Sequence, residues 1–589
     1  MKGDVEQPSA AALAALVGAP PQAVPPPLSS VAAGAGPREV ARWSDRTRIL
    51  AALAVLVLII AGTITGAMRR TSTTFDEIVL VAGGARGYET GRFDLAPEHP
   101  PLMQYVYGLP VFLAGPSYPV EAEATPPDFG YRYTYAREFF WRSGNDPERL
   151  AFLGRLMAVL CAVLLVLVTY GFAAPRIGRP PALLAALLVG LLPDVLAHGG
   201  VAYNDVPLAL AFVASVWAFD AAARRPSWRN GAAAGLLLAI ALGVKFSAVT
   251  LLPIAGLVVG AEAMVRRGER DWSRAVAVAT CAGMAATYLG LVLIYRGDFA
   301  LAEFRYGLEY TFQHVERGHG APGYLLNRSS PTGWWYFFPV AFLFKTPAAL
   351  HVLAVLAAYG LVLWLGALRA AAGSVSLGRS VHALLGSPLR AAVAGVLVFG
   401  AALLSSSLVI GFRYALPLLP LVCILIAAGV AAVWRSAAPR LRVALAVLVM
   451  LYAASSLSYY PHFLAYISEY GPGRDRGDLV LLDSSLDWGQ GLLELREFMR
   501  EEGFDSVYLS YFGSADPMGY GIEYLPLPSF FPLDPPQPTE EAAPSAQWVA
   551  ISATNLHGVY LAGDPLAQFR ALTPDRVLAK SLFLYRIDD

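Results

Sequence analysis

Carboxylates and one imidazole recur beside long apolar runs in this sequence. Asp76 and Glu77 follow the first such run, Glu98 and His99 lie within Pro-Glu-His-Pro-Pro, and Asp205 begins Asp-Val-Pro between two further runs. A positioned carboxylate can take the proton of a hydroxyl nucleophile. The Glu-His pair could bind a metal, or hold a phosphate through the imidazolium. Structural roles are also open, because acids and early prolines are typical of helix N-termini and Pro-rich segments of exposed turns.

Cations form a second group. The chain has four lysines among its 44 basic residues, and two of them, Lys245 and Lys345, lie at the ends of apolar runs. Arg413 precedes Tyr414 at the end of another run, and aromatic residues crowd 334–339. Ammonium and guanidinium groups bind phosphate. The alternatives are lysines extending to lipid headgroups, an arginine that anchors a helix, and an interfacial aromatic belt, which could equally wall a sugar or isoprenoid groove.

Long apolar helices must position these residues. Spanning a bilayer takes about 20 apolar residues in a helix. Suitable runs lie near 49–67, 151–173, 181–198, 205–221, 231–244, 247–264, 275–295, 347–368, 391–411, 416–433 and 442–459. The stretch 231–264 is divided in two near Lys245, because Arg-rich segments flank both of its ends and both are expected on the cytoplasmic side. The sequence therefore predicts an α-helical polytopic membrane protein with about eleven transmembrane helices.

The composition agrees with a membrane protein. Of 589 residues, 56% are hydrophobic and 15% charged, the formal net charge is zero and the mean hydropathy is +0.51. Soluble domains are about 25% charged. An ordinary soluble enzyme and a disordered chain are therefore excluded, and the zero net charge gives no indication of nucleic-acid binding. The three cysteines all lie in apolar runs, which argues against a disulfide framework or a cysteine metal site.

The charge distribution predicts the orientation. The expected inner segments contain 19 arginines and four acids, whereas 68–149 contains 11 acids and eight arginines. By the positive-inside rule the N-terminus is cytoplasmic, and 68–149 and 296–346 form outer loops. The Ala- and Pro-rich residues 1–48 are expected to be a disordered cytoplasmic tail rather than a signal peptide. A bacterial inner-membrane protein is expected.

The last part of the chain, 461–589, predicts a small extracytoplasmic α/β domain. Charged residues, Pro and Gly become more frequent there, and short apolar runs alternate with an amphipathic segment. Expected strands are 479–483, 506–511, 548–552 and 582–587, with helices over 492–502 and near 565–572. The polar and aromatic segment 482–490 indicates either a capped turn or an acceptor-binding loop.

Taken together, the acids, histidine and cations gather on one membrane face, above a body suited to a lipid tail. That combination favours a transferase that takes a group from a lipid phosphate. In order along the chain, Asp-Glu at 76–77, Glu-His-Pro-Pro-Leu at 98–102, Asn-Asp-Val-Pro at 204–207, Gly-Val-Lys-Phe at 243–246 and Phe-Lys-Thr-Pro at 344–347 resemble the GT-C glycosyltransferases. Within that superfamily the chain is most similar to family 39, which includes protein O-mannosyltransferase-like enzymes and the aminoarabinose transferases of lipid A. The resemblance covers about 49–460.

The resemblance implies an inverting transfer of a sugar from a polyprenyl-phosphate donor to an acceptor hydroxyl. Asp76 would be the catalytic base, with Glu77 orienting it or the acceptor and Asp205 as a second site acid. His99, Lys245, Lys345, Arg413 and Tyr414 are the donor phosphate-binding candidates, and Glu98 and His99 the metal candidates. Use of a divalent metal varies in the superfamily, so no cofactor is assigned. The acceptor, whether protein, lipid or glycan, is left open.

A transporter or flippase of lipid-linked sugars is the alternative. Transporters tend to have internal repeats and ionisable groups at mid-membrane. This sequence shows no repeat, and its notable charges lie at span ends. The enzyme is therefore favoured over the flippase, and no nucleic-acid partner is expected.

Overall fold

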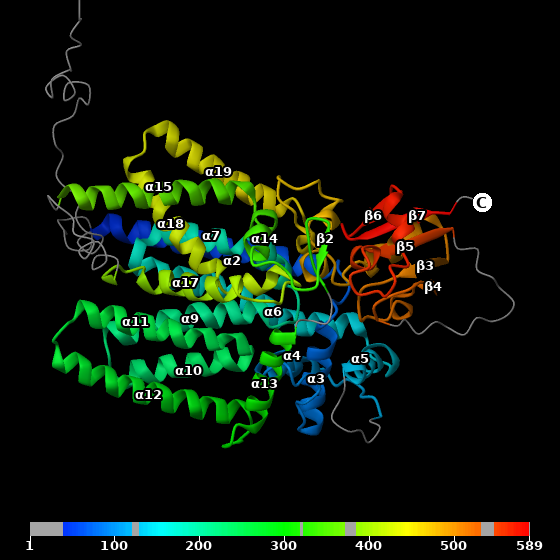
Figure 1. The fold of residues 1–589 in the computed structure, drawn as a ribbon, viewed down its shortest axis with the longest axis horizontal. Coiled ribbons are helices and arrows are strands. Elements are labelled where there is room, and N and C mark those ends of the chain that lie inside the picture. Colours follow the sequence, from blue (N-terminus) through cyan, green and yellow to red (C-terminus); the bar gives the residue numbers. More distant parts are fainter. Residues whose placement is uncertain (1–38, 121–128, 318–321, 372–384, 532–546, 588–589) are drawn as a thin grey trace, which may run out of the picture.

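The computed structural model describes residues 39–120, 129–317, 322–371, 385–531 and 547–587. Most of this chain is a bundle of long helices with roughly parallel axes, and a small sheet domain sits at one end (Figure 1). The predicted helical membrane protein with a small C-terminal α/β domain is confirmed. The end of the bundle next to this sheet is called the sheet end below.

Every one of the eleven apolar runs contains a helix. The helices are α2 (Glu39–Met68), α6 (Pro147–Ile177), α7 (Arg179–Gly190), α9 (Asp205–Arg224), α10 (Trp228–Val244), α11 (Leu251–Val265), α12 (Arg270–Ile294), α15 (Ala348–Ala371), α17 (Arg390–Leu404), α18 (Leu419–Ser436) and α19 (Pro439–Leu457). In the described ranges, seven helical segments are long and apolar enough to cross a membrane. An eighth forms if α14 (Phe337–Lys345) and α15, bent by 114°, count as one span. The chain is therefore multi-pass, with α7, α10 and α17 shorter than a full span.

Three boundaries bear on the predictions. Helix α2 begins at Glu39, so residues 39–48 are helical where a disordered tail was expected, and 1–38 lie outside the described residues. The run 181–198 breaks before Pro193, which begins the short helix α8 (Pro193–His198), because proline cannot continue the hydrogen bonding of α7. The division near Lys245 is confirmed, since α10 ends at Val244 and a 3₁₀ turn precedes α11.

Short helices cross the bundle at the sheet end (Figure 1). They are α3 (Glu77–Thr90), α4 (Leu102–Leu113), α5 (Phe129–Arg137), α13 (Ala302–Arg317) and α14, accompanied by the hairpin β1 (Gly323–Leu325) and β2 (Arg328–Ser330). Helices α3 and α4 touch backbone to backbone, because a Cβ on Gly84 would lie 2.8 Å from the Gly108 Cα atom. This close contact fixes the packing of α3, which begins at the candidate acids Asp76 and Glu77, against α4.

The C-terminal domain contains a five-stranded mixed sheet of order β4-β3-β5-β7-β6. Its elements are α20 (Leu492–Glu502), β3 (Ser506–Ser510), β4 (Glu523–Pro526), β5 (Trp548–Ser552), β6 (Arg576–Leu578) and β7 (Leu582–Arg586). Helix α20 and strands β3, β5 and β7 confirm the predictions, and the expected helical stretch near 565–572 is the 3₁₀ turn Ala567–Ala571. The expected strand 479–483 is wrong, because that segment is irregular and joins two 3₁₀ turns, Gly477–Leu479 and Asp483–Ser485.

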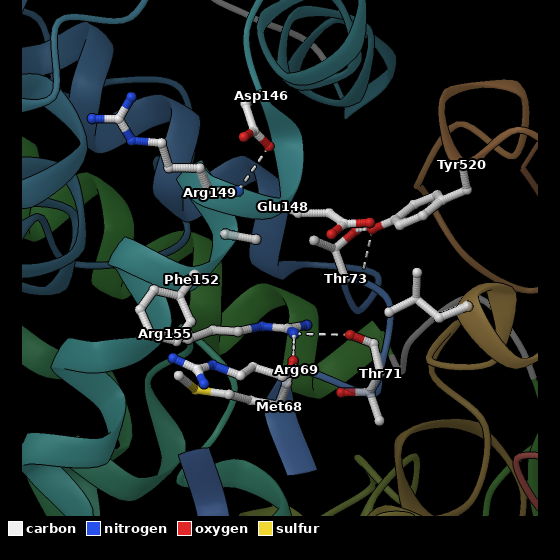
Figure 2. A pocket seen from close by; sticks show the side chains of 12 residues that line it. Met68, Arg69, Thr71, Thr73, Asp146, Glu148, Arg149, Phe152, Arg155 and Tyr520 are labelled. Carbon is white, nitrogen blue, oxygen red and sulfur yellow. Dashed lines mark hydrogen bonds between the residues drawn. The ribbon is translucent and has the colours of Figure 1, made fainter. Parts of the chain in front are cut away.

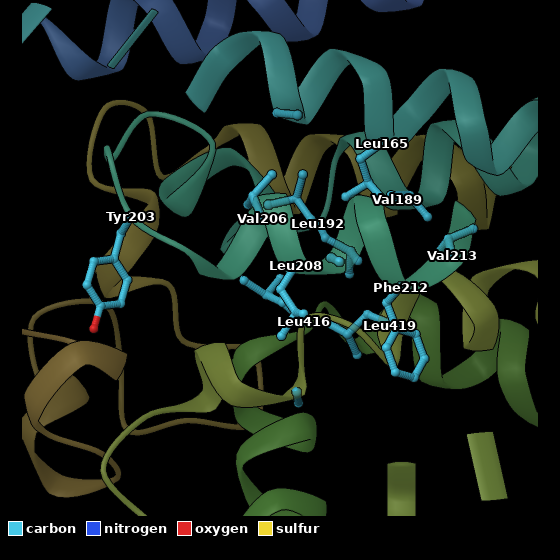
Figure 3. Packing of buried hydrophobic residues seen from close by; sticks show 14 of the residues in the cluster. Leu165, Val189, Leu192, Tyr203, Val206, Leu208, Phe212, Val213, Leu416 and Leu419 are labelled. Atoms are coloured by element: carbon cyan, nitrogen blue, oxygen red, sulfur yellow. The ribbon is translucent and has the colours of Figure 1, made fainter. Parts of the chain in front are cut away.

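One hydrophobic core runs from the bundle to the sheet end. Figure 3 shows Leu165, Val189, Leu208 and Leu419 of α6, α7, α9 and α18 packed together. Tyr203 lies at the edge of this packing, with its hydroxyl directed away from the leucines (Figure 3). The apolar core therefore gives way to polar groups at Tyr203, just before Asp205.

Candidate active site

Asp76 is, with Glu98, one of two predicted acids whose side chains stay partly exposed. It occupies the N-cap position of α3 but makes no capping hydrogen bond through its side chain. The Tyr133 hydroxyl instead donates to Asp76 Oδ1 at 2.8 Å, and Arg413 Nη2 lies 3.8 Å from Oδ2. The side chain is 24% exposed in surroundings that are otherwise buried. Asp76 is therefore a partly exposed carboxylate next to a cation.

Asp205 holds the two cations of the site. Lys245 Nζ donates to its Oδ1 at 2.6 Å, and Arg413 Nη1 donates to its Oδ2 at 3.4 Å. The carboxylate is 2% exposed, so it faces the cations rather than solvent. A buried charge is tolerated when it is paired and hydrogen-bonded. We interpret Asp205 as the residue that keeps Lys245 and Arg413 together.

Aromatic rings enclose these cations. The Arg413 guanidinium lies 4.3 Å from the Trp488 ring centre, 4.8 Å from that of Tyr203 and 5.2 Å from that of Tyr414. The Lys245 ammonium lies 4.5 Å from the Tyr414 ring centre. Aromatic faces attract cations, and the attraction grows when water is excluded. Tyr414 therefore belongs to the site through its ring, beside the predicted cation.

Glu98 and His99 lie next to this group but do not form a metal centre. Glu98 pairs with Arg132, and Tyr203 Oη lies 3.1 Å from His99 Nε2. In the described part of the chain, no three His, Cys, Asp or Glu side chains gather as metal ligands. Burial, together with the nearby cations led by Lys245, lowers the pKa of His99 to about 3. The ring is therefore neutral near pH 7, and its one hydrogen-bonding contact is with the Tyr203 hydroxyl.

Glu77 is buried behind the site, where it can position Asp76, one of its two predicted roles, but cannot contact an acceptor. Arg155 donates to both of its carboxylate oxygens at 2.8 Å, and the Ala202 amide donates to Oε1 at 2.9 Å. Glu77 is fully buried. It therefore joins α3 to α6 and to the segment before α9. These contacts hold the start of α3, and with it the backbone of the neighbouring Asp76.

Lys345 is also placed away from a phosphate. Its ammonium donates to the carbonyl oxygens of Leu464 at 2.7 Å and Ser485 at 2.8 Å, and Asp194 Oδ1 lies 3.8 Å away. The side chain is fully buried. Its predicted role in donor binding is therefore wrong. Lys345 instead ties α14 to the segment that follows the last span, because its ammonium donates to two carbonyl oxygens of that segment.

A cavity lies beside the site. It has a volume of about 430 Å³ and is lined by the end of α2, the start of α6 and two side chains of the C-terminal domain. In Figure 2, Arg155 donates to the carbonyl oxygens of Met68 and Thr71, and Arg69 lies against Phe152. Neither Asp76 nor its contacts line this cavity. The cavity is therefore separate from the carboxylate and cations described above.

Asp487 of the C-terminal domain gives a pH prediction. Its side chain is 2% exposed, and burial raises its pKa from 3.8 to about 7. The folded protein thus holds this proton more tightly than the unfolded chain, so stability falls as the pH rises from about 4 to 7. Between pH 5 and pH 8, the free energy of unfolding of wild type should fall by about 2–3 kcal/mol more than that of Asp487→Asn, which has no proton to lose at this position.

Unfolding of both proteins at the two pH values measures this difference. The matched control is Asp505→Asn, which changes an exposed aspartate of the same domain and should leave the pH profile as it is. A profile that is the same for Asp487→Asn and wild type would contradict the prediction.

The fold and the site define a multi-pass membrane protein with paired acids and cations at one end of its bundle. Residues 149–295 match the family model described as dolichyl-phosphate-mannose-protein mannosyltransferase. This match agrees with the resemblance to the GT-C glycosyltransferases seen in the sequence. It covers the spans α6 to α12, which include Asp205 and Lys245. Comparison with curated proteins finds no match.

Solved structures give weaker similarities. ArnT from Cupriavidus metallidurans, bound to undecaprenyl phosphate, is 17% identical with a TM-score of 0.41, over 70% of this chain and 65% of that one. The oligosaccharyltransferase AglB from Archaeoglobus fulgidus, with an inhibitory peptide and a dolichol-phosphate, is 13% identical with a TM-score of 0.44, over 75% and 60%. The chain thus spans slightly less than two thirds of either protein. Similarity at this level carries no residue role to this chain.

Proposed function

We propose that this protein transfers a sugar from a polyprenyl-phosphate donor to an acceptor hydroxyl with inversion at the anomeric carbon. The observation that carries the proposal is the open carboxylate of Asp76, which lies 3.8 Å from Arg413 in a buried group of cations. A base and phosphate-binding cations are the two requirements of this reaction. They occur together at one end of an apolar bundle that suits a lipid-linked donor.

The reaction follows from this geometry. The acceptor hydroxyl gives its proton to Asp76 as its oxygen bonds to the anomeric carbon. The bond from that carbon to the phosphate oxygen breaks, and polyprenyl phosphate leaves with one more negative charge. Arg413 and Lys245 stabilise the developing charge, and the aromatic rings around them exclude water, which strengthens the attraction. Asp205 keeps both cations in place before the donor arrives.

The arginine bias of the sequence supports an orientation for this reaction. We place the sheet end outside a bacterial inner membrane and the N-terminus in the cytoplasm. The donor tail then lies in the outer leaflet, and the acceptor is a protein, lipid or glycan hydroxyl outside the cell. At the opposite end, Arg176, Arg224 and Arg390 surround the buried Asp220, which agrees with a cation-rich cytoplasmic side.

The direct test is the release of polyprenyl phosphate. Purified full-length protein is incubated with undecaprenyl-phosphate monosaccharides of several sugars and with envelope extract from a strain that lacks the gene. We expect one sugar donor to yield free undecaprenyl phosphate and a labelled acceptor of inverted configuration. No release from any donor, combined with movement of the lipid across vesicles without an acceptor, would favour the flippase instead. No observation of the fold favours that alternative.

A further inference from the structure

The segment 483–490 of the C-terminal domain lies inside the candidate site. It follows the last span and precedes α20, and Asp483, Ser484, Ser485, Trp488 and Gln490 are all buried. Asp483 has a positive φ of 52°, and the chain turns there towards the bundle. This segment packs at the junction of the bundle and the sheet domain, so it is neither a surface turn nor a linker.

Its contacts converge on Arg413. Ser484 Oγ accepts a hydrogen bond from Arg413 Nε at 2.9 Å, and the Trp488 ring lies 4.3 Å from the guanidinium carbon. Ser485 Oγ accepts from the Phe412 amide at 2.9 Å. An arginine has many side-chain conformations. One hydrogen bond at Nε and one ring against the guanidinium select the conformation that points Nη1 and Nη2 at the two site acids.

The same segment holds the backbone before the base. The Phe75 amide donates to the Trp488 carbonyl at 2.9 Å, and the Ser72 amide donates to the Gln490 carbonyl at 3.1 Å. The Ser72 hydroxyl also donates to the Gly489 carbonyl at 2.8 Å. Residues 72–75 therefore pair with 488–490, and Asp76 follows directly. Both the base and the cation are thus held by one stretch of the C-terminal domain.

We propose that Trp488 and Ser484 are positioning residues for the donor phosphate, which they set through Arg413, so that the C-terminal domain completes the site. This inference rests on the proposed function. It assigns the domain a part in donor binding rather than a merely structural one. A donor phosphate would then meet a guanidinium that is already oriented, and less conformational freedom would be lost on binding.

Undecaprenyl phosphate itself is the probe, because its binding can be measured without knowing the sugar or the acceptor. Full-length protein in detergent is titrated with the lipid, and the shift in thermal unfolding gives the affinity. We expect Trp488→Leu to weaken binding about tenfold. Trp488→Phe keeps an aromatic face and should stay within about threefold of wild type. Ser484→Ala should weaken binding by about threefold to tenfold, and Ser484→Thr should restore it.

A double-mutant cycle separates positioning from general loss of structure. If Trp488 acts through Arg413, then Trp488→Leu should change the affinity by less than about twofold in an Arg413→Gln background. Trp548→Leu is the matched control, because Trp548 is a buried tryptophan of the same domain that packs on Phe498 and Phe504 instead. It should lower the unfolding temperature but leave the affinity unchanged.

The outcomes are distinct. Wild-type protein that does not bind undecaprenyl phosphate would overturn the proposed function, and this inference with it. Wild-type binding that Trp488→Leu leaves intact would overturn the inference alone. Equal losses of affinity in Trp488→Leu and Trp548→Leu would show that the segment has only a structural role. Equal effects of Trp488→Leu with Arg413 and with Arg413→Gln would show the same, and either result would also overturn the inference.

Discussion

Asp76→Asn is expected to lower kcat by about 10²- to 10⁴-fold, the usual contribution of a general base. Asparagine keeps the shape of the side chain and can still accept the hydrogen bond from Tyr133, so the fold should be unaffected. It cannot take a proton from the acceptor. Binding of undecaprenyl phosphate should be unchanged or slightly tighter, because a negative charge 3.8 Å from Arg413 is removed. Transfer rates and lipid titrations on the same preparation test both statements.

The matched control for this change is Asp146→Asn. Asp146 also lies at the sheet end, and its carboxylate accepts from the Arg149 amide at 3.0 Å to cap α6. Asparagine caps a helix about as well as aspartate, so this variant should keep wild-type activity. If Asp76→Asn transfers sugar at the wild-type rate, Asp76 is not the base.

Glu77→Gln is expected to lower the free energy of unfolding by about 3–5 kcal/mol. The substitution leaves the Arg155 guanidinium buried without its carboxylate, and an uncompensated buried charge is strongly destabilising. The loss should be smaller in the double variant Glu77→Gln with Arg155→Gln than the sum of the single losses, because the pair is removed together. Denaturant unfolding in detergent measures all three variants.

Glu303→Gln provides the comparison. Glu303 pairs with Arg296 at 2.9 Å but is 56% exposed, and exposed pairs contribute less than about 1 kcal/mol. A large loss in this variant, or a Glu77→Gln protein as stable as wild type, would contradict the buried-pair interpretation. A catalytic Glu77 would instead give a stable but inactive variant, so the two roles can be separated.

Much of the fold could be predicted because bilayer spans and short strands leave strong periodic signals. The eleven apolar runs each contain a helix, and α20 and β5 were predicted with their exact bounds. The strand predicted over 479–483 is wrong because its apolar residues are divided between two cores: Val480 and Leu481 pack with the bundle and Leu482 packs on the sheet. Strands β4 and β6 are only four and three residues long. Such short pieces carry too little pattern to be recognised, since the sheet supplies their stability.

The candidate site could be predicted only in part. Asp76, Asp205, Lys245, Arg413 and Tyr414 do come together, because the first three flank helix ends at the same end of the bundle and the last two lie in the 3₁₀ turn Phe412–Ala415 just before α18. Residue type alone could not separate Asp76 from Glu77, whose side chains leave adjacent positions in different directions. Nor could it separate Lys245 from Lys345, since both follow apolar runs. Burial and hydrogen-bond partners, which depend on distant parts of the chain, decide both cases.

The roles of Tyr133, Ser484 and Trp488 had no signal that could place them at Asp76 and Arg413. The polar and aromatic character of 482–490 did mark that segment as unusual, but it indicated a capped turn or an acceptor-binding loop. Neither interpretation included contacts with Arg413 or with residues 72–75. Its actual partners lie about 70 to 400 residues earlier in the chain. Contacts over such separations follow from tertiary packing and leave no local pattern in one sequence.

The pairing of 72–75 with 488–490 has a consequence for biosynthesis. Proteins are synthesised and inserted from the N-terminus, and domains generally fold in that order. Asp76 emerges with the first span, but the contacts of its backbone and of Arg413 with 484–490 form only once the final domain has been synthesised and has folded. The nascent protein therefore remains without a completed site throughout insertion, and it becomes active in the last step of its own assembly.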